Sequence, residues 1–287
     1  MQDGLPSQTA RGAAAYRAVH QTLDGGSIFR DPFALRILDD ETRAGLDGIA
    51  ADESLRPMRL LIAARSRFSE DMLSAAVTRG IRQVVVLGAG LDTFALRNPH
   101  AGVGLRVFEV DYPATQAWKR ERLKDAGIEI PPSLIFAPVD FERQRLAEGL
   151  AGAGFNFNGP AFFQWLGVVP YLTRDAITAT LAFIIKIPDS EVVFDYAEPF
   201  ENYRPERRAS IMAVAARAAA RGEPWLSLFD PAEIAGLLRA KGFAAIEDLG
   251  LGAIADRFYG PLKQGIVIGP GAHLVHAQKN AGSSAPG

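Results

Sequence analysis

The sequence predicts an α/β fold: a mostly parallel sheet of seven strands, with helices on both faces and an antiparallel last strand. Short runs rich in Val, Ile and Phe recur along the chain, and helical patterns separate the first five of them. Such alternation forms parallel sheets through right-handed crossovers. Gly and Pro interrupt the stretch before the last run, so no clean crossover helix is expected there. The predicted strands span residues 83–88, 105–110, 133–137, 160–166, 191–196, 243–249 and 272–278.

Composition limits the partners that this chain can take. It has 287 residues, of which 48% are hydrophobic, so one large domain with an ample core is expected. The formal net charge of −2 argues against nucleic acid as a partner, because binding to phosphates needs a basic surface. The chain has no cysteine, and His273 and His276 alternate with apolar residues as in a strand, so no metal site is expected. No long apolar run and no signal peptide are seen, so we expect no membrane contact and a cytoplasmic location.

A helical extension, residues 1–80, is predicted before the first strand. One helix is expected over residues 9–23, a second is expected to start at Asp31-Pro32, and a longer third covers residues 55–79. Such an extension serves equally well as a lid over a site or as a surface for a second copy of the chain. A homodimer is therefore one expected assembly.

Arg65 interrupts the apolar face of the third predicted helix. Met58, Leu61 and Phe68 share that face with it at helical spacing. An arginine on a buried face must find an anion. Two interpretations stay open: a structural ion pair with an acidic side chain, or a bidentate bond to the carboxylate of a ligand.

The first strand runs into the most informative segment of the chain, residues 84–93 (VVVLGAGLDT). Gly88 and Gly90 predict a turn at which the backbone approaches a ligand closely. The second strand carries an acidic pair, Glu109 and Asp111, to the same edge of the sheet. A carboxylate there suits the two hydroxyls of a ribose, since it accepts two hydrogen bonds and donates none. We therefore expect a ligand that contains a nucleoside.

The residues after the second glycine favour a methyl donor over a dinucleotide. Thr93 stands where a dinucleotide-binding turn has a third Gly or Ala, and Asp92 precedes it. This acid puts negative charge where a pyrophosphate would need a helix N-terminus free of anions. S-adenosylmethionine fits better, because it has a ribose, no phosphate, an ammonium group and a sulfonium. A nicotinamide or flavin site is the less favoured alternative.

A second insertion, over residues 199–228, is predicted between the fifth and sixth strands. Its Ala- and Arg-rich part, residues 203–221, is typical of a helix, and residues 222–225 (GEPW) follow. The insertion lies at the ligand edge, where it either covers the site as a lid or packs as plain structural cover. The α/β domain is expected over residues 81–279, and the tail, residues 280–287, is expected to be disordered.

Six segments carry a resemblance to a known family. In chain order they are Asp31-Pro32-Phe33-Ala34, Arg65-Ser66-Arg67-Phe68, residues 87–93 (LGAGLDT), residues 108–113 (FEVDYP), Val139-Asp140-Phe141, and Gly167-Val168 with Tyr171-Leu172-Thr173. Together they resemble the leucine carboxyl methyltransferase-like family of class I S-adenosylmethionine-dependent methyltransferases, which includes polyketide O-methyltransferases. The resemblance covers residues 5–260 and is carried most strongly by GAGLDT and FEVDYP at the right separation. It implies a class I methyltransferase Rossmann-like sheet of seven strands and a role in secondary metabolism.

The resemblance also implies a set of residues that bind the methyl donor. It assigns Arg65 to the carboxylate of the donor and the turn at Gly88 to its methionine backbone. It assigns Asp111 to the ribose hydroxyls, and Asp140 and Phe141 to the two sides of the adenine. The full predicted set is Arg65, Gly88, Ala89, Gly90, Asp92, Thr93, Asp111, Tyr112, Asp140, Phe141 and Gln164. Where the family often has a Glu-Gly pair before the fourth-strand Tyr-Leu, this chain has Leu166-Gly167. Gln164 or Trp165 is therefore expected to change how the amino end of the donor is held or how the acceptor enters.

These observations predict an S-adenosylmethionine-dependent O-methyltransferase that acts on a small-molecule carboxylate or hydroxyl by in-line transfer. Such a displacement depends mostly on alignment and on a dry site. Tyr171, Tyr203 and Arg207 are candidates for contacts with the acceptor, no catalytic residue is assigned, and no metal is expected. Two alternatives stay open: a catalytically silent protein that binds S-adenosylmethionine, and a nicotinamide-dependent oxidoreductase.

Overall fold

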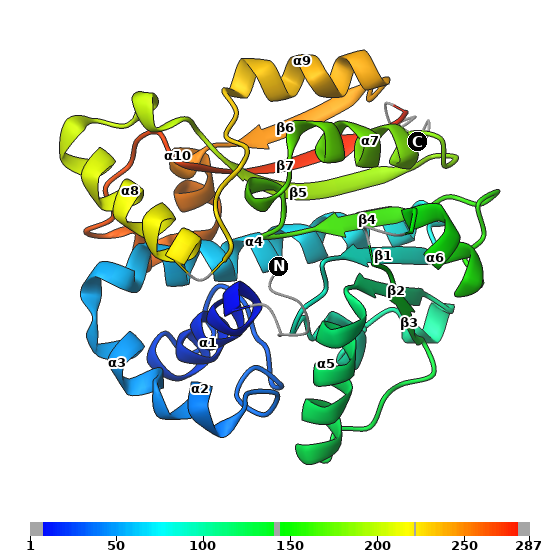
Figure 1. Cartoon of the computed structure of the whole chain (residues 1–287), viewed down its shortest axis with the longest axis horizontal. Coiled ribbons are helices and arrows are strands. Elements are labelled where there is room, and N and C mark those ends of the chain that lie inside the picture. Colours follow the sequence, from blue (N-terminus) through cyan, green and yellow to red (C-terminus); the bar gives the residue numbers. More distant parts are fainter. Residues whose placement is uncertain (1–7, 141–143, 221, 281–287) are drawn as a thin grey trace.

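The computed structural model describes residues 8–140, 144–220 and 222–280. At its centre lies a seven-stranded sheet with the strand order β3-β2-β1-β4-β5-β7-β6 (Figure 1). The strands are β1 (Gln83–Leu87), β2 (Arg106–Asp111), β3 (Leu134–Pro138), β4 (Phe162–Trp165), β5 (Glu191–Ala197), β6 (Ala245–Leu249) and β7 (Ala272–Gln278). Only β7 runs antiparallel to its neighbours, β5 and β6. The predicted fold class is confirmed, because all seven strands lie where the apolar runs placed them.

Helices cover both faces of the sheet, and β1 shows how the two faces are built. Its alternate side chains point to opposite faces, so that Val85 belongs to one apolar cluster and Val84 to the other. Helices α6 (Leu146–Gly152), α7 (Arg174–Ile184) and α9 (Pro231–Lys241) pack on the first face. Helices α4 (Arg56–Thr78) and α10 (Leu251–Ile254) pack on the second. A third cluster joins α1 (Gln8–Leu23) to α5 (Pro113–Asp125).

Two short helices, α2 (Asp40–Ala44) and α3 (Leu46–Ala51), follow α1. The prediction of a helix that starts at Asp31-Pro32 is wrong, because residues 32–37 form turns and residue 38 forms a bend. The Asp31 carboxylate is buried and bound to Arg17, and the side chains of Ala34 and Ile37 insert into the third cluster. These tertiary contacts fix the segment as turns, and the next helix, α2, begins only after its N-cap Asp39.

The connection from β1 to β2 contains no α-helix, contrary to the helical pattern predicted there. It holds only two 3₁₀ turns, η2 (Phe94–Leu96) and η3 (Ala101–Val103). The stretch is short, Pro99 lies between the two turns, and Gly104 takes a left-handed conformation at φ 78°. The remaining short turns are η1 (Glu53–Leu55), η4 (Val169–Tyr171), η5 (Phe200–Asn202), the π-turn η6 (Ala255–Tyr259) and η7 (Gly260–Lys263).

The predicted helix of the second insertion is present as α8 (Pro205–Ala220). Not one of its residues is fully buried, and it lies on the same side of the molecule as the N-terminal helices (Figure 1). Among the described residues, no helix is both long and apolar enough to span a bilayer. Phe141 and residues 281–287 of the predicted tail lie outside the described residues.

Candidate functional site

A cavity of about 490 Å³ lies at the carboxyl ends of β1, β2 and β4. Helices α1 and α4 form part of its wall, and the segment that follows α8 forms another part. Its lining comprises Thr9, Ala10, Ala13, Arg17, Arg65, Ser66, residues 86–92, Asp111, Gln164, Leu166, Gly167, Val168, Tyr171, Leu172, Gly222, Glu223, Pro224 and Leu226. Ligands of open α/β sheets bind at this edge.

The cavity brings together most of the residues that the sequence singled out. The predicted residues in its lining are Arg65, Gly88, Ala89, Gly90, Asp92, Asp111, Gln164 and Tyr171. The predicted residues that are described but do not line it are Thr93, Tyr112, Asp140, Tyr203 and Arg207. Arg17 and Glu223 line it although the sequence did not single them out.

Three of the residues outside the lining have other contacts. The Thr93 hydroxyl donates to the Asp31 carboxylate at 2.7 Å, so this side chain supports the turn from behind. Tyr203 is buried, which raises its pKa to about 12. Arg207 donates to the carbonyl of Val267 at 3.1 Å. The structure therefore gives no support to Tyr203 or Arg207 as acceptor contacts and leaves Tyr171 as the candidate.

Asp111 joins the floor of the cavity to the glycine turn. Its Oδ2 accepts a hydrogen bond from the amide of Gly90 at 2.6 Å, and its Oδ1 accepts one from the amide of Tyr112 at 2.7 Å. Burial raises the pKa of Asp111, while these two amides oppose the rise by stabilising the carboxylate. The side chain thus fixes the turn and still reaches the cavity.

The other half of the acidic pair, Glu109, does not reach the cavity. It is buried inside the fold, where its Oε2 lies 2.6 Å from Nζ of Lys119. Burial raises the pKa of Glu109 to about 7, against the opposing charge of Lys119. Lys119 also donates to the carbonyl of Asp92 at 2.6 Å, so this pair supports the glycine turn from below. Of the acidic pair of β2, Asp111 alone therefore brings a carboxylate to the cavity.

Arg65 reaches the cavity and also has a carboxylate partner within the chain. Its Nη1 donates to Oδ2 of Asp195 at 3.1 Å, and Oδ1 of Asp195 accepts the amide of Gly167 at 2.5 Å. A Cβ atom at position 167 would lie 2.8 Å from both Nη atoms of Arg65, so only glycine leaves room for the guanidinium. Both interpretations of Arg65 are compatible with this arrangement, because the paired guanidinium also lines the cavity.

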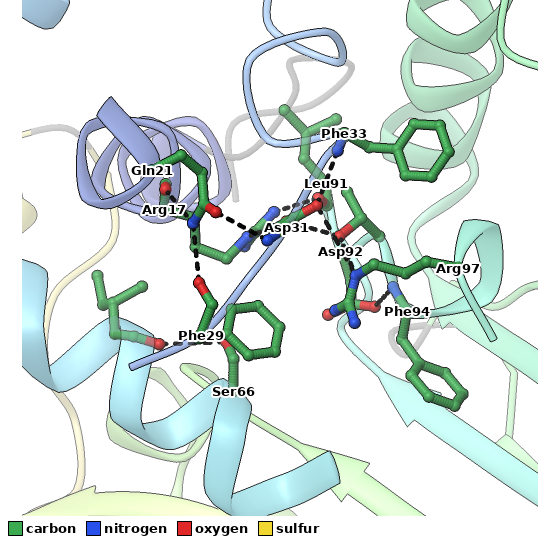
Figure 2. A network of polar contacts seen from close by, with 12 residues as sticks. Arg17, Gln21, Phe29, Asp31, Phe33, Ser66, Leu91, Asp92, Phe94 and Arg97 are labelled. Atoms are coloured by element: carbon green, nitrogen blue, oxygen red, sulfur yellow. Dashed lines mark hydrogen bonds and ion pairs between the residues drawn. The ribbon is translucent and has the colours of Figure 1, made fainter. Parts of the chain in front are cut away.

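Arg17 ties helix α1 to the glycine turn through a buried polar network (Figure 2). Its Nη2 donates to the carbonyl of Leu91 at 2.6 Å, and its Nε donates to Oδ2 of Asp31 at 3.2 Å. Arg97 lies 3.7 Å from Oδ1 of the same carboxylate. The N-terminal extension is therefore bound directly to the backbone of the turn that forms the cavity floor.

Gln164 supplies an acceptor without a partner. The residue is 2% exposed and lines the cavity, and its Oε1 is buried with no hydrogen-bond partner. Leaving such an atom unsatisfied costs about 1–3 kcal/mol. A ligand that carries a hydrogen-bond donor, such as an ammonium group, would satisfy it.

Replacing Gly88 with Ala should damage the turn. Gly88 has φ +66°, and an added Cβ would lie 2.5 Å from Cγ2 of Val168. The left-handed backbone alone costs an L-residue about 1–2 kcal/mol, and the clash adds to this. We expect a lower free energy of unfolding in urea and weaker ligand binding. Gly152→Ala is the control, because nothing lies within 4 Å of its added Cβ; equal stability of the two variants would contradict the prediction.

The lining limits the chemistry that the cavity supports. No histidine lines it. No α-helix N-terminus follows the glycine turn to receive a pyrophosphate, since only the 3₁₀ turns η2 and η3 lie between it and β2. Among the described residues, no group of three or more His, Asp or Glu side chains could hold a metal ion. A dinucleotide would therefore lack the anion site that such turns usually supply.

Comparisons with known proteins agree on one family. The family model described as leucine carboxyl methyltransferase matches residues 10–185. The chain is 37% identical over 218 residues to YktD of Bacillus subtilis (strain 168), a provisionally named S-adenosyl-L-methionine-dependent methyltransferase; this covers 75% of the chain and 71% of YktD. It is 35% identical over 183 residues to a protein of the same provisional name from Mycobacterium avium (strain 104). That alignment covers 58% of the chain and 57% of the relative, so the match reaches little more than half of that protein.

A solved structure shares the overall fold. The chain superposes on a DUF574 family protein from Streptomyces avermitilis MA-4680 with a TM-score of 0.56, covering 97% of this chain and 99% of that one. The two sequences are 16% identical, so this likeness concerns the fold alone.

Proposed function

The chain belongs to the leucine carboxyl methyltransferase family of S-adenosylmethionine-dependent methyltransferases, and we propose that it methylates an oxygen atom of a small molecule. The observation that carries the proposal is the composition of the cavity. A glycine turn with Asp111 and Arg65 forms one part of the lining, and Tyr171 with apolar side chains forms another. A volume of about 490 Å³ is in the range of pockets for small molecules.

The lining offers a partner to each polar part of the donor. When bound, the donor supplies a methyl group on a sulfonium. We assign Arg65 to its carboxylate, Asp111 to its ribose hydroxyls and the orphaned Oε1 of Gln164 to its ammonium group. The glycine turn at Gly88 then lies against the methionine moiety.

The remaining lining suits an acceptor with an apolar body. Leu166, Leu172, Pro224 and Leu226 contribute apolar surface, and Tyr171 contributes one hydroxyl. Burial raises the pKa of Tyr171, so this hydroxyl stays protonated at neutral pH and can donate a hydrogen bond to a ligand. An oxygen atom of the acceptor would accept this hydrogen bond. Alignment of acceptor and donor in a site closed to water accounts for the rate in such a displacement.

Donor binding tests the cofactor part of the proposal. Donor at 100 times its dissociation constant should stabilise the folded protein by about 2.7 kcal/mol, seen as a rise in melting temperature. Arg65→Met keeps the apolar stem but removes the charge, and we expect it to weaken donor affinity by about tenfold to 100-fold. Arg67→Met is the matched control, since Arg67 lies on the same helix, is exposed and pairs with Asp71. Equal donor affinity of the two variants would contradict the role of Arg65.

Product formation tests the transfer itself. Wild-type protein given donor and a panel of hydroxylated and carboxylated small molecules should produce S-adenosylhomocysteine and an oxygen-methylated product. A product methylated on nitrogen or carbon would refute O-methylation and leave the donor site intact. Donor binding without any methyl transfer would favour the silent binding protein.

A further inference from the structure

The charges of the cavity lining are unbalanced in favour of carboxylates. Two arginines line it, Arg17 and Arg65, and each already faces a carboxylate of the chain, at 3.2 Å and 3.1 Å. Three carboxylates line it as well, those of Asp92, Asp111 and Glu223. A cationic donor is favoured by this balance. An anionic acceptor is not, because Arg17 is bound to Asp31 and to the carbonyl of Leu91, and Arg65 is assigned to the carboxylate of the donor.

The three carboxylates come from different parts of the chain. Asp111 and Asp92 both belong to the floor, where Asp111 accepts the amide of Gly90 and Asp92 accepts the amide of Phe94 at 2.8 Å. Glu223 comes from the segment that follows α8 and lines the cavity. It is therefore the one carboxylate of the three that comes from neither the glycine turn nor β2.

Glu223 is held in a defined position. Its Oε2 accepts a hydrogen bond from the amide of Thr9 at 3.0 Å, which joins the segment after α8 to the beginning of α1. The proline that follows, Pro224, restricts the backbone of Glu223 to extended conformations. A carboxylate that lines the cavity and is held in place can serve as a proton acceptor for a hydroxyl bound within its reach.

Tyr171 connects Glu223 to the acceptor part of the cavity. Both residues line it, next to Leu172 and Pro224. Burial is the main reason that the pKa of Tyr171 is raised, and the charges of Glu223 and Asp195 add to the rise. The negative charge of the Glu223 carboxylate is therefore felt at the Tyr171 hydroxyl.

We propose that Glu223 accepts the proton of a neutral hydroxyl acceptor during methyl transfer, which rests on the O-methylation proposed above. An oxygen lone pair of the acceptor forms the bond to the methyl carbon while the bond from that carbon to sulfur breaks. The electron pair of the broken bond stays on sulfur, which becomes a neutral thioether. The hydroxyl proton passes to the Glu223 carboxylate and then to water. Carboxylic acids, ionised at neutral pH, are poor acceptors here because they meet Glu223 with a like charge.

The test compares wild-type protein with Glu223→Gln, which keeps an oxygen for the Thr9 amide. The probes are methyl-labelled donor with a panel of substituted phenols and the matching benzoates. Mild alkali separates the products, since it releases the label from methyl esters and not from methyl ethers. We expect wild-type label in alkali-stable ethers of phenols. In Glu223→Gln, kcat for phenols should fall by about 10²–10⁴-fold while donor affinity, measured by calorimetry, stays within about threefold.

Matched controls separate the outcomes. Glu206→Gln changes an exposed glutamate of α8 and should leave turnover at the wild-type level. An acceptor that is already ionised at the assay pH, such as 4-nitrophenol, needs no base and should lose far less rate in Glu223→Gln. Undiminished turnover of neutral phenols by Glu223→Gln, or wild-type label mainly in alkali-labile esters, would overturn the role of Glu223 and leave O-methylation standing. Label in neither class, with donor still bound, would overturn both proposals.

Discussion

Replacing Asp31 with Ala is expected to lower the free energy of unfolding by about 3–5 kcal/mol, the largest stability change that we foresee for a single side chain. Asp31 is 1% exposed and accepts hydrogen bonds from Arg17, from the Thr93 hydroxyl and from the amide of Phe33 (Figure 2). Its removal leaves the buried Arg17 guanidinium with the carbonyl of Leu91 as its one remaining hydrogen-bond partner in the part of the chain that the structure describes. Urea denaturation followed by circular dichroism measures the loss.

The loss in the free energy of unfolding should differ between substitutions of Asp31 and of its partner Arg17. Arg17→Met leaves the Asp31 carboxylate with the Thr93 hydroxyl, the Phe33 amide and Arg97 at 3.7 Å, so it should cost clearly less than Asp31→Ala. Glu41→Ala is the matched control, because Glu41 is exposed and pairs with Arg11 at the surface. A surface pair contributes at most about 1 kcal/mol. If Asp31→Ala lowered the free energy of unfolding by less than about 1 kcal/mol, the stabilising role that we assign to the buried Asp31 carboxylate would be wrong.

Replacing Asp111 with Ala is expected to abolish the rise in melting temperature that the donor produces. The change removes the acceptor for two ribose hydroxyls, and hydrogen bonds to a charged group are worth about 1.5–3 kcal/mol each. It also releases the amides of Gly90 and Tyr112, so the glycine turn loses its fixed shape. Together these losses amount to at least about 3 kcal/mol, or affinity weakened by about 100-fold or more. Isothermal titration calorimetry with S-adenosylhomocysteine measures this.

Asp125→Ala provides the comparison for Asp111. Asp125 is exposed at the end of α5 and pairs with Arg122, so its loss should change neither donor affinity nor stability noticeably. The donor affinity of Asp111→Asn should fall between those of wild type and Asp111→Ala. The Asp111 carboxylate accepts hydrogen bonds from two backbone N–H groups, and the side-chain NH₂ of Asn would have to face one of them. Donor affinity in Asp111→Ala within about threefold of wild type would make the ribose assignment wrong.

The strands could be predicted from the sequence because each is a local signal. Buried parallel strands such as Val84–Val86 within β1 are continuous apolar runs, and turn residues bound them. The helix expected at Asp31-Pro32 failed for a non-local reason. Its first carboxylate serves Arg17 and Thr93 in the tertiary structure, and the apolar residues after it are anchored one by one.

The floor of the cavity could also be predicted, because a motif with a defined backbone conformation carries it. Gly88 and Gly90 both take positive φ, as the turn requires. The parts of the cavity wall that come from α1 and from the segment after α8 could not be predicted in the same way. Arg17 meets the carbonyl of Leu91 across 74 residues of chain, and Thr9 meets Glu223 across 214. Such pairs leave no periodic or spacing signal in a single sequence.

Close packing around three glycines links the evolutionary histories of distant positions. A side chain at position 88 would collide with Val168, one at position 90 with Ala10, and one at position 167 with Arg65. A descendant that gains a side chain at one of these glycines must therefore also change the residue opposite. We expect such positions to vary as pairs across the family, so that inherited changes at the glycine turn appear together with changes in α1 and after β4.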